Sequence, residues 1–172
     1  MGILSGNPKH EPLHEGEVFF LWSMSSNAKN AVSCYQTYLN HAGDKELVKL
    51  LEDLADQARK EHQDCDRLLV DNGIVPSPTL PEKPRANPEA IPVGARFTDA
   101  EIATVISTDH AVGLAACSQA MGSSMREDVG ALFAKFHAAK AIIGLRLLRL
   151  NKNKGWMTPP PLNRQQFEPV EA

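Results

Sequence analysis

The chain has 172 residues, of which 42% are hydrophobic and 23% charged, and its net charge is −3. This composition is typical of a globular protein, and the length predicts a single domain spanning residues 1–172. The sequence contains no strongly basic segment and no apolar run of membrane-spanning length, so we expect neither a nucleic-acid partner nor a membrane partner.

The three cysteines, Cys34, Cys65 and Cys117, are far apart in the sequence. Their odd number and the lack of any metal-type spacing between them predict reduced thiols. Each falls at an apolar position of a predicted helix, so we expect all three to be buried. Reduced thiols in turn favour a cytoplasmic location.

The N-terminal half predicts an arm followed by a helical hairpin. Residues 1–13 form the arm, and a first helix should run from about residue 14 to residue 42. Its apolar residues recur every three or four positions, at Leu21, Met24, Ala28, Val32, Tyr35 and Leu39. Gly43 ends this helix, Asp44 caps a second helix over residues 45–72, and Gly73 ends that one. The short connection makes the two helices antiparallel neighbours.

A proline-rich segment separates this hairpin from a second one. Residues 74–97 carry prolines at positions 76, 78, 81, 84, 88 and 92, so we expect a non-helical crossover that makes the second and third helices parallel. Thr98 and Glu101 form a capping box that begins a third helix, to about residue 123. A fourth helix follows over residues 126–153, and residues 155–172 form a C-terminal tail.

Two antiparallel hairpins joined by one long crossover predict an all-α fold, a ferritin-like four-helix bundle. The di-metal sites of such bundles require Glu-x-x-His pairs on two helices. The sequence has this spacing only at Glu11 and His14, where Pro12 interrupts it ahead of the first helix. A standard di-metal site is therefore not expected.

Charged residues nevertheless fall on the apolar stripes of the predicted helices. Glu61 lies near the middle of the second stripe, Asp109 near the middle of the third, and Lys140 within the fourth. Asp109 and Lys140 are almost equally far along the chain from the turn near Met125, which places them at the same height. Because an unpaired buried charge is costly, we predict a structural ion pair between Asp109 and Lys140, shared with Glu61.

The alternative interpretation of these positions is a metal site. Carboxylates and imidazoles suit zinc or iron, and the candidate ligands are Glu61, His62, Asp109, His110 and His137. Against it, the first helix supplies no ligand at this height, and the Lys140 cation would repel a metal ion. The expected state is therefore a protein without a cofactor or a catalytic residue.

The first helix carries apolar residues on more than one side. Phe19, Phe20 and Trp22 extend beyond its core stripe. A second apolar face is typical of a contact between copies or a docking surface, so we expect self-association, most simply as a homodimer.

Several segments resemble a known family. They are Leu13-His14-Glu15-Gly16-Glu17-Val18-Phe19 leading into Leu21-Trp22-Ser23, the run from Tyr35 to His41, Asn72-Gly73-Ile74-Val75-Pro76, and Gly155-Trp156 with Pro159-Pro160. They are similar to ferritin-like proteins of spore-forming bacilli, described as uncharacterised or as spore coat proteins and related to spore coat protein F. The resemblance covers essentially the whole chain. It implies a helical bundle and a coat role, with no catalytic residues, because the family has no established activity.

The sequence thus predicts a non-enzymatic structural or interaction protein, associated with the spore coat and able to bind itself or other coat proteins. The alternative is a metal-binding or redox protein, a metal-dependent oxidoreductase that would use the acid–histidine residues between the second, third and fourth helices.

Overall fold

The computed structural model describes residues 11–161 of the chain. Its main elements are four long helices, α1 (Glu15–His41), α2 (Lys45–Asp71), α3 (Asp99–Ser123) and α4 (Glu127–Lys154). Two short 3-10 helices, η1 (Pro88–Ala90) and η2 (Val93–Ala95), lie in the crossover. Within the described residues there is no strand, and no helix combines the length and hydrophobicity needed to cross a membrane. The predicted all-α bundle is confirmed.

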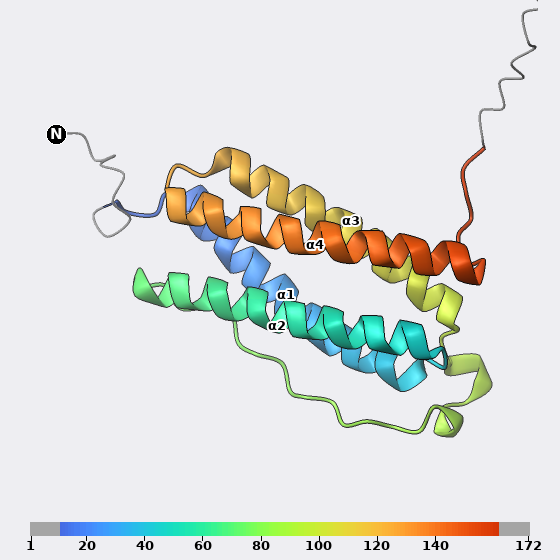
Figure 1. Ribbon diagram of the computed structural model, residues 1–172. Helices are drawn as coiled ribbons and strands as arrows, with labels where there is room; N and C mark the ends of the chain where they lie inside the picture. The colour runs from blue at the N-terminus through green and yellow to red at the C-terminus, as the bar shows by residue number, and fades with distance from the viewer. Residues whose placement is uncertain (1–10, 162–172) are drawn as a thin grey trace, which may run out of the picture.

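The two hairpins form the two halves of the bundle, with α1 against α2 and α3 against α4. They meet through α1 with α3 and α2 with α4, and α2 and α3 run parallel as predicted (Figure 1). Parts of the predicted N-terminal arm and C-terminal tail, residues 1–10 and 162–172, lie outside the described residues.

Capping residues fix the helix boundaries close to the predicted positions. Asp44 accepts hydrogen bonds from the backbone N–H groups of Glu46 and Leu47, and Thr98 and Glu101 form the predicted capping box. Gly155 ends α4 with φ +70°, a left-handed conformation that glycine adopts without steric penalty. Local sequence signals therefore decide where these helices begin and end.

The crossover runs along the α1–α2 hairpin, on the side away from α3 and α4 (Figure 1). The Asn40 side chain binds the backbone on both sides of Arg85, at the Pro84 carbonyl and the Ala86 N–H. Proline supplies no backbone donor, so side chains of α1 hold much of the segment in place. The two 3-10 helices were not expected; Pro88 occupies the first position of η1 and Pro92 precedes η2, where a fixed φ favours a turn.

The core consists of two apolar clusters, one toward each end of the bundle. One is built from Leu39, Ala42, Leu47, Leu50, Leu51, Leu54, Ile102, Ile106, Ile143, Leu147 and Leu150. The other is built from Leu21, Met24, Cys65, Leu69, Cys117, Ala120, Val129, Phe133 and Phe136. Glu61 and His110 are buried polar residues of the two middle helices, α2 and α3, and belong to neither cluster.

Candidate functional site

An ion pair joins α2 to α4 in the interior of the bundle. The Lys140 Nζ atom donates to Glu61 Oε2 at 2.7 Å, and the two side chains are 14% and 4% exposed. Gln57 donates to the other carboxylate oxygen, also at 2.7 Å. The stem of Lys140 lies only 3.4 Å from where a Cβ on Gly113 would stand. Glu61 therefore has a partner on each oxygen, and a glycine of α3 leaves room for the lysine.

Asp109 does not share this ion pair. It is exposed on α3 and forms no ion pair within residues 11–161, so the predicted Asp109–Lys140 pair is not formed. The reason is the direction of α3, whose buried residues include Ile106, His110 and Cys117 and leave Asp109 at the rim. Burial raises the pKa of Tyr35, and the charges of Asp109 and Glu61 raise it further.

His110 is a buried histidine that contacts backbone. Its Nε2 lies 2.5 Å from the Lys140 carbonyl oxygen, to which the N–H of the neutral ring donates a hydrogen bond. Burial lowers the pKa of His110, although the hydrogen bond to Lys140 opposes the shift. The ring lies 3.2 Å from where a Cβ on Gly144 would stand. His110 therefore holds α3 against α4 at a position where α4 needs a glycine.

The other two candidate histidines have different surroundings. His62 Nδ1 lies 3.5 Å from Asp66 Oδ2 and is buried without a hydrogen bond. His137 is half-buried and forms no side-chain hydrogen bond within the described residues. In the described part of the chain no three histidine, cysteine or acidic residues are placed to hold a metal ion. The five residues of the metal alternative therefore do not converge.

The cysteines also differ from expectation in one respect. Cys65 and Cys117 are buried thiols in the core, as predicted, but Cys34 is exposed on α1. Cys34 follows the buried residue Lys29 by five positions, which places it about 140° further around α1 and on a different side of the helix. Burial raises the pKa of Cys117 to about 11 and raises that of Cys65 further still. The two buried thiols are therefore kept protonated.

A second buried ion pair, which the sequence did not predict, joins α1 to α2. Lys29 is only 4% exposed, and its ammonium lies 2.9 Å from Asp66 Oδ2. It also donates to the Ser77 carbonyl of the crossover, while Ser25 donates to Asp66. Burial works against ionisation of Asp66, but the hydrogen bonds from Ser25 and Lys29 and the lysine charge lower its pKa. Lys29 therefore ties the crossover to the first hairpin.

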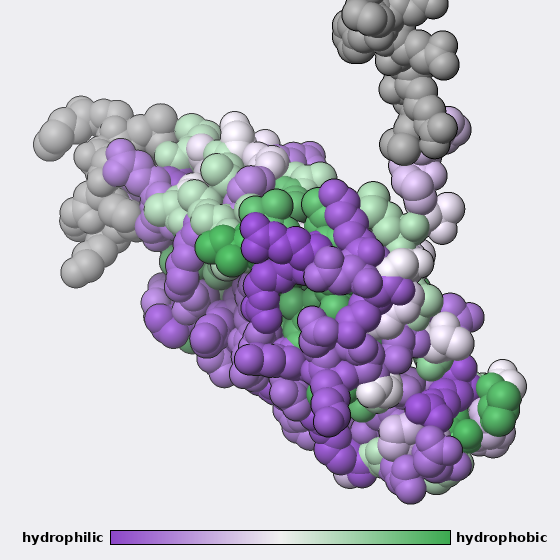
Figure 2. Space-filling view, turned by 45° about the vertical axis from the view of Figure 1, so that its right-hand side comes forward, coloured by the Kyte–Doolittle hydropathy of each residue, from purple (hydrophilic) through white to green (hydrophobic). Residues whose placement is uncertain are grey.

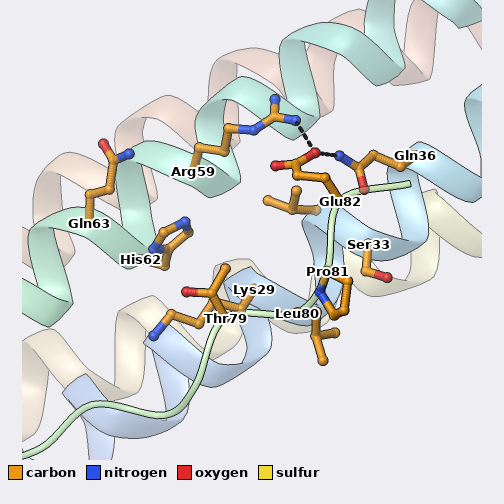
Figure 3. A pocket seen from close by; sticks show the side chains of 11 residues that line it. Lys29, Ser33, Gln36, Arg59, His62, Gln63, Thr79, Leu80, Pro81 and Glu82 are labelled. Atoms are coloured by element: carbon orange, nitrogen blue, oxygen red, sulfur yellow. Dashed lines mark hydrogen bonds and ion pairs between the residues drawn. The ribbon is translucent and has the colours of Figure 1, made fainter. Parts of the chain in front are cut away.

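A pocket of about 220 Å³ opens between this ion pair and the crossover (Figure 3). Its walls are formed by Lys29, Val32, Ser33, Gln36, Arg59, His62, Gln63, Thr79, Leu80, Pro81 and Glu82. Figure 3 shows Glu82 reaching from the crossover to Arg59 and Gln36, and Glu82 Oε2 lies 3.7 Å from the arginine. Both cations of the wall therefore face an acid of the protein itself.

A carboxylate network closes the end of the bundle near the N-terminus. Glu17 is fully buried, and its Oε1 accepts hydrogen bonds at 2.8 Å from the backbone N–H groups of Met125 and Arg126 at the start of α4. His14 caps α1 through its Nδ1 atom, which accepts from Gly16 and Glu17. A Cβ on Gly16 would stand 2.7 Å from the His14 ring. The His14-Glu15-Gly16-Glu17 run is thus a cap for two helices, α1 and α4.

Arg126 fastens three segments at the same end. It is 4% exposed and donates to Asp128, to the Glu11 carbonyl and to the Asn72 side chain that ends α2. Together with Glu17 it joins the start of α1, the end of α2 and the α3–α4 turn. The buried charged residues at this end therefore stabilise the packing of these segments.

Apolar residues remain exposed on the second hairpin. α3 has one charged residue after Glu101, which is Asp109, and exposes Val105, Val112 and Met121. α4 exposes Ile142, Leu145 and Leu148, which are 64%, 57% and 38% accessible. Figure 2 shows hydrophobic and neutral residues over the upper part of one face, whereas hydrophilic residues dominate the lower part. On α1, Phe19 and Trp22 are also exposed.

Comparison with known proteins places the chain among bacterial relatives. Residues 1–167 match the family described as "Protein of unknown function (DUF3231)". The uncharacterized protein YvdQ of Bacillus subtilis (strain 168) is 46% identical over 166 residues, 96% of this chain and 98% of that protein. The structure is similar to the crystal structure of a putative spore coat protein (BH2358) from Bacillus halodurans C-125. Its TM-score is 0.91 at 45% identity, covering 92% of this chain and all of that one. The chain belongs to the DUF3231 family.

Proposed function

We propose that this protein is a non-enzymatic structural or interaction protein built on a ferritin-like four-helix bundle. In this proposal it is made in the cytoplasm and assembles with the bacterial spore coat. The name given to the structural relative BH2358 supports the location. At 45% identity and a TM-score of 0.91, the two proteins share their fold in detail.

The exposed apolar surface of the second hairpin is the observation that carries the proposal. A soluble chain that works alone seldom leaves such a surface uncovered. The buried charges Lys29, Glu61 and Arg126 each face a protein group at hydrogen-bond distance, so they support packing between helices. An architectural role uses both features, because a rigid bundle can present a fixed apolar surface to a neighbour.

A fluorescent fusion observed through sporulation tests the location. We expect a diffuse signal in growing cells and a ring around the forming spore, with the fluorescent protein alone as the control. A fusion that stays diffuse and is absent from purified spores would refute the coat assignment. Metal analysis of protein purified without an affinity tag tests the architectural role, since near-stoichiometric zinc or iron would contradict it.

A further inference from the structure

The outward side of α4 carries a second regular apolar pattern besides the one in the core. Six residues recur alternately every three and four positions, the a/d spacing of a coiled coil. They are Ala131, Ala134, Ala138, Ala141, Leu145 and Leu148, and we call them the outer seam. Ala131, Ala138, Leu145 and Leu148 are exposed, and Ala134 and Ala141 are half-buried.

The core-facing residues of α4 form a separate set, Val129, Phe133, Phe136, Ile143, Leu147 and Leu150, all buried within the bundle. One helix therefore has two apolar seams, of which only one is covered. A seam with heptad spacing is what a second helix covers by knobs-into-holes packing.

Unpaired charges of opposite sign stand at the two ends of the outer seam. Glu127 continues the a/d spacing at its N-terminal end and Lys152 continues it at its C-terminal end. Both are exposed, and neither forms an ion pair within residues 11–161. At 1.5 Å per residue they stand about 38 Å apart along α4.

This pattern is self-complementary when two copies of α4 run antiparallel. We infer that a second copy of this chain covers the outer seam, with the two α4 helices related by a two-fold axis near the Ala139–Lys140 peptide. Lys152 of one copy then faces Glu127 of the other, and Ala138 faces Ala141. Leu148 faces Ala131 and Leu145 faces Ala134, so each large side chain meets a small one. A parallel pairing would instead bring like charges together at both ends.

Within residues 11–161, no segment covers the exposed residues of the outer seam. The crossover already occupies the outer side of the first hairpin (Figure 1). On α3, the surface away from the core carries small residues, Ala111, Ala115, Ser118 and Gly122, all exposed. Small residues allow a neighbouring helix to approach closely, so α3 does not obstruct a second copy at the seam.

The mass of the full-length protein in solution, measured by light scattering over a concentration series, tests the inference. We expect a dimer. Ala138→Glu brings a carboxylate to the centre of the seam in each copy, and like charges there should weaken dimerisation roughly a hundredfold. Ala90→Glu, the same change at an exposed position of η1 in the crossover, serves as the control and should leave the dimer intact. Thermal unfolding of each variant shows that both still fold.

Charge reversal tests the antiparallel direction. Glu127→Lys and Lys152→Glu should each weaken the dimer about tenfold, because each creates two like-charged contacts. The double variant restores the opposite charges and should dimerise like the unmodified protein. A double variant as weak as either single one overturns the antiparallel pairing. The proposal that the outer seam is the dimer interface is refuted if the protein is a monomer at all concentrations. It is also refuted if Ala138→Glu does not weaken the dimer.

The inference rests on the proposed assembly role, but the two fail separately. A monomeric protein found in the spore coat refutes only the α4 seam. A dimer that Ala138→Glu disrupts, in a protein absent from spores, refutes only the coat location.

Discussion

Replacing Lys140 with methionine should be among the most destabilising changes at a charged position of this protein. Methionine keeps the stem that crosses Gly113 but removes the ammonium, so the Glu61 carboxylate, 4% exposed, loses its cation. Breaking a buried ion pair from one side costs about 3–5 kcal/mol. Gln57 still donates to Glu61 and the lysine end is partly solvated, which places the expected loss near the lower bound, about 3 kcal/mol.

Urea denaturation measures this loss. With a slope of roughly 2 kcal/mol per molar urea, the midpoint should fall by about 1.5 M. Adding Glu61→Gln to the Lys140→Met variant removes the orphaned charge, and most of the lost stability should return. Lys135→Met is the matched control on the same helix. Its partner Asp64 lies at a similar distance, 2.8 Å, but Lys135 is 68% exposed, so we expect a change under about 0.5 kcal/mol.

The result that refutes this reasoning is equal destabilisation in the single and double variants. The loss would then come from packing of the lysine stem and not from the charge left on Glu61.

Three further outcomes are expected. Gly16→Ala places a methyl group against the His14 ring and should cost about 1 kcal/mol in thermal unfolding, whereas Gly122→Ala, with open space around it, should not destabilise. The lowered pKa of Asp66 means that its contribution to stability is present above about pH 4 and is lost as the pH falls below that value; urea midpoints of Asp66→Asn should therefore change less on acidification. A thiol reagent should label Cys34 rapidly in the folded protein, and label Cys65 and Cys117 only after denaturation.

The helix boundaries could be predicted because they depend on a few neighbouring residues. Asp44, the Thr98–Glu101 pair and Gly155 act within one turn of the chain, so their effect does not depend on the tertiary structure. The crossover was equally visible, since a run of prolines excludes a long helix.

The site residues were harder to predict. Helix periodicity shows which side of a helix faces the core only when that helix has clearly distinct apolar and polar sides. α3 is apolar on nearly all sides, so the middle of its buried face was misplaced and Asp109 was assigned to the interior. Glu17 and Lys29 were missed for the opposite reason. Charged residues on a first helix are ordinarily solvated, and their burial depends on the α3–α4 turn and the crossover, which are remote in sequence. The sequence did contain a signal that Glu17 is buried. It precedes Leu21 of the core stripe by four residues, so both side chains lie on the same side of α1.

The attachment of the crossover to α1 has a consequence for how the chain reaches its folded state. Each hairpin closes through a short turn, so its contacts are local and should form rapidly. The two hairpins can meet only after the long segment between them has lost its freedom, which is an entropic cost. The crossover binds Lys29, Gln36 and Asn40 of α1, so it can become ordered on the first hairpin before the second hairpin docks. These contacts offset the entropic cost. We therefore expect α1, α2 and the crossover to form the template on which the remaining helices dock last.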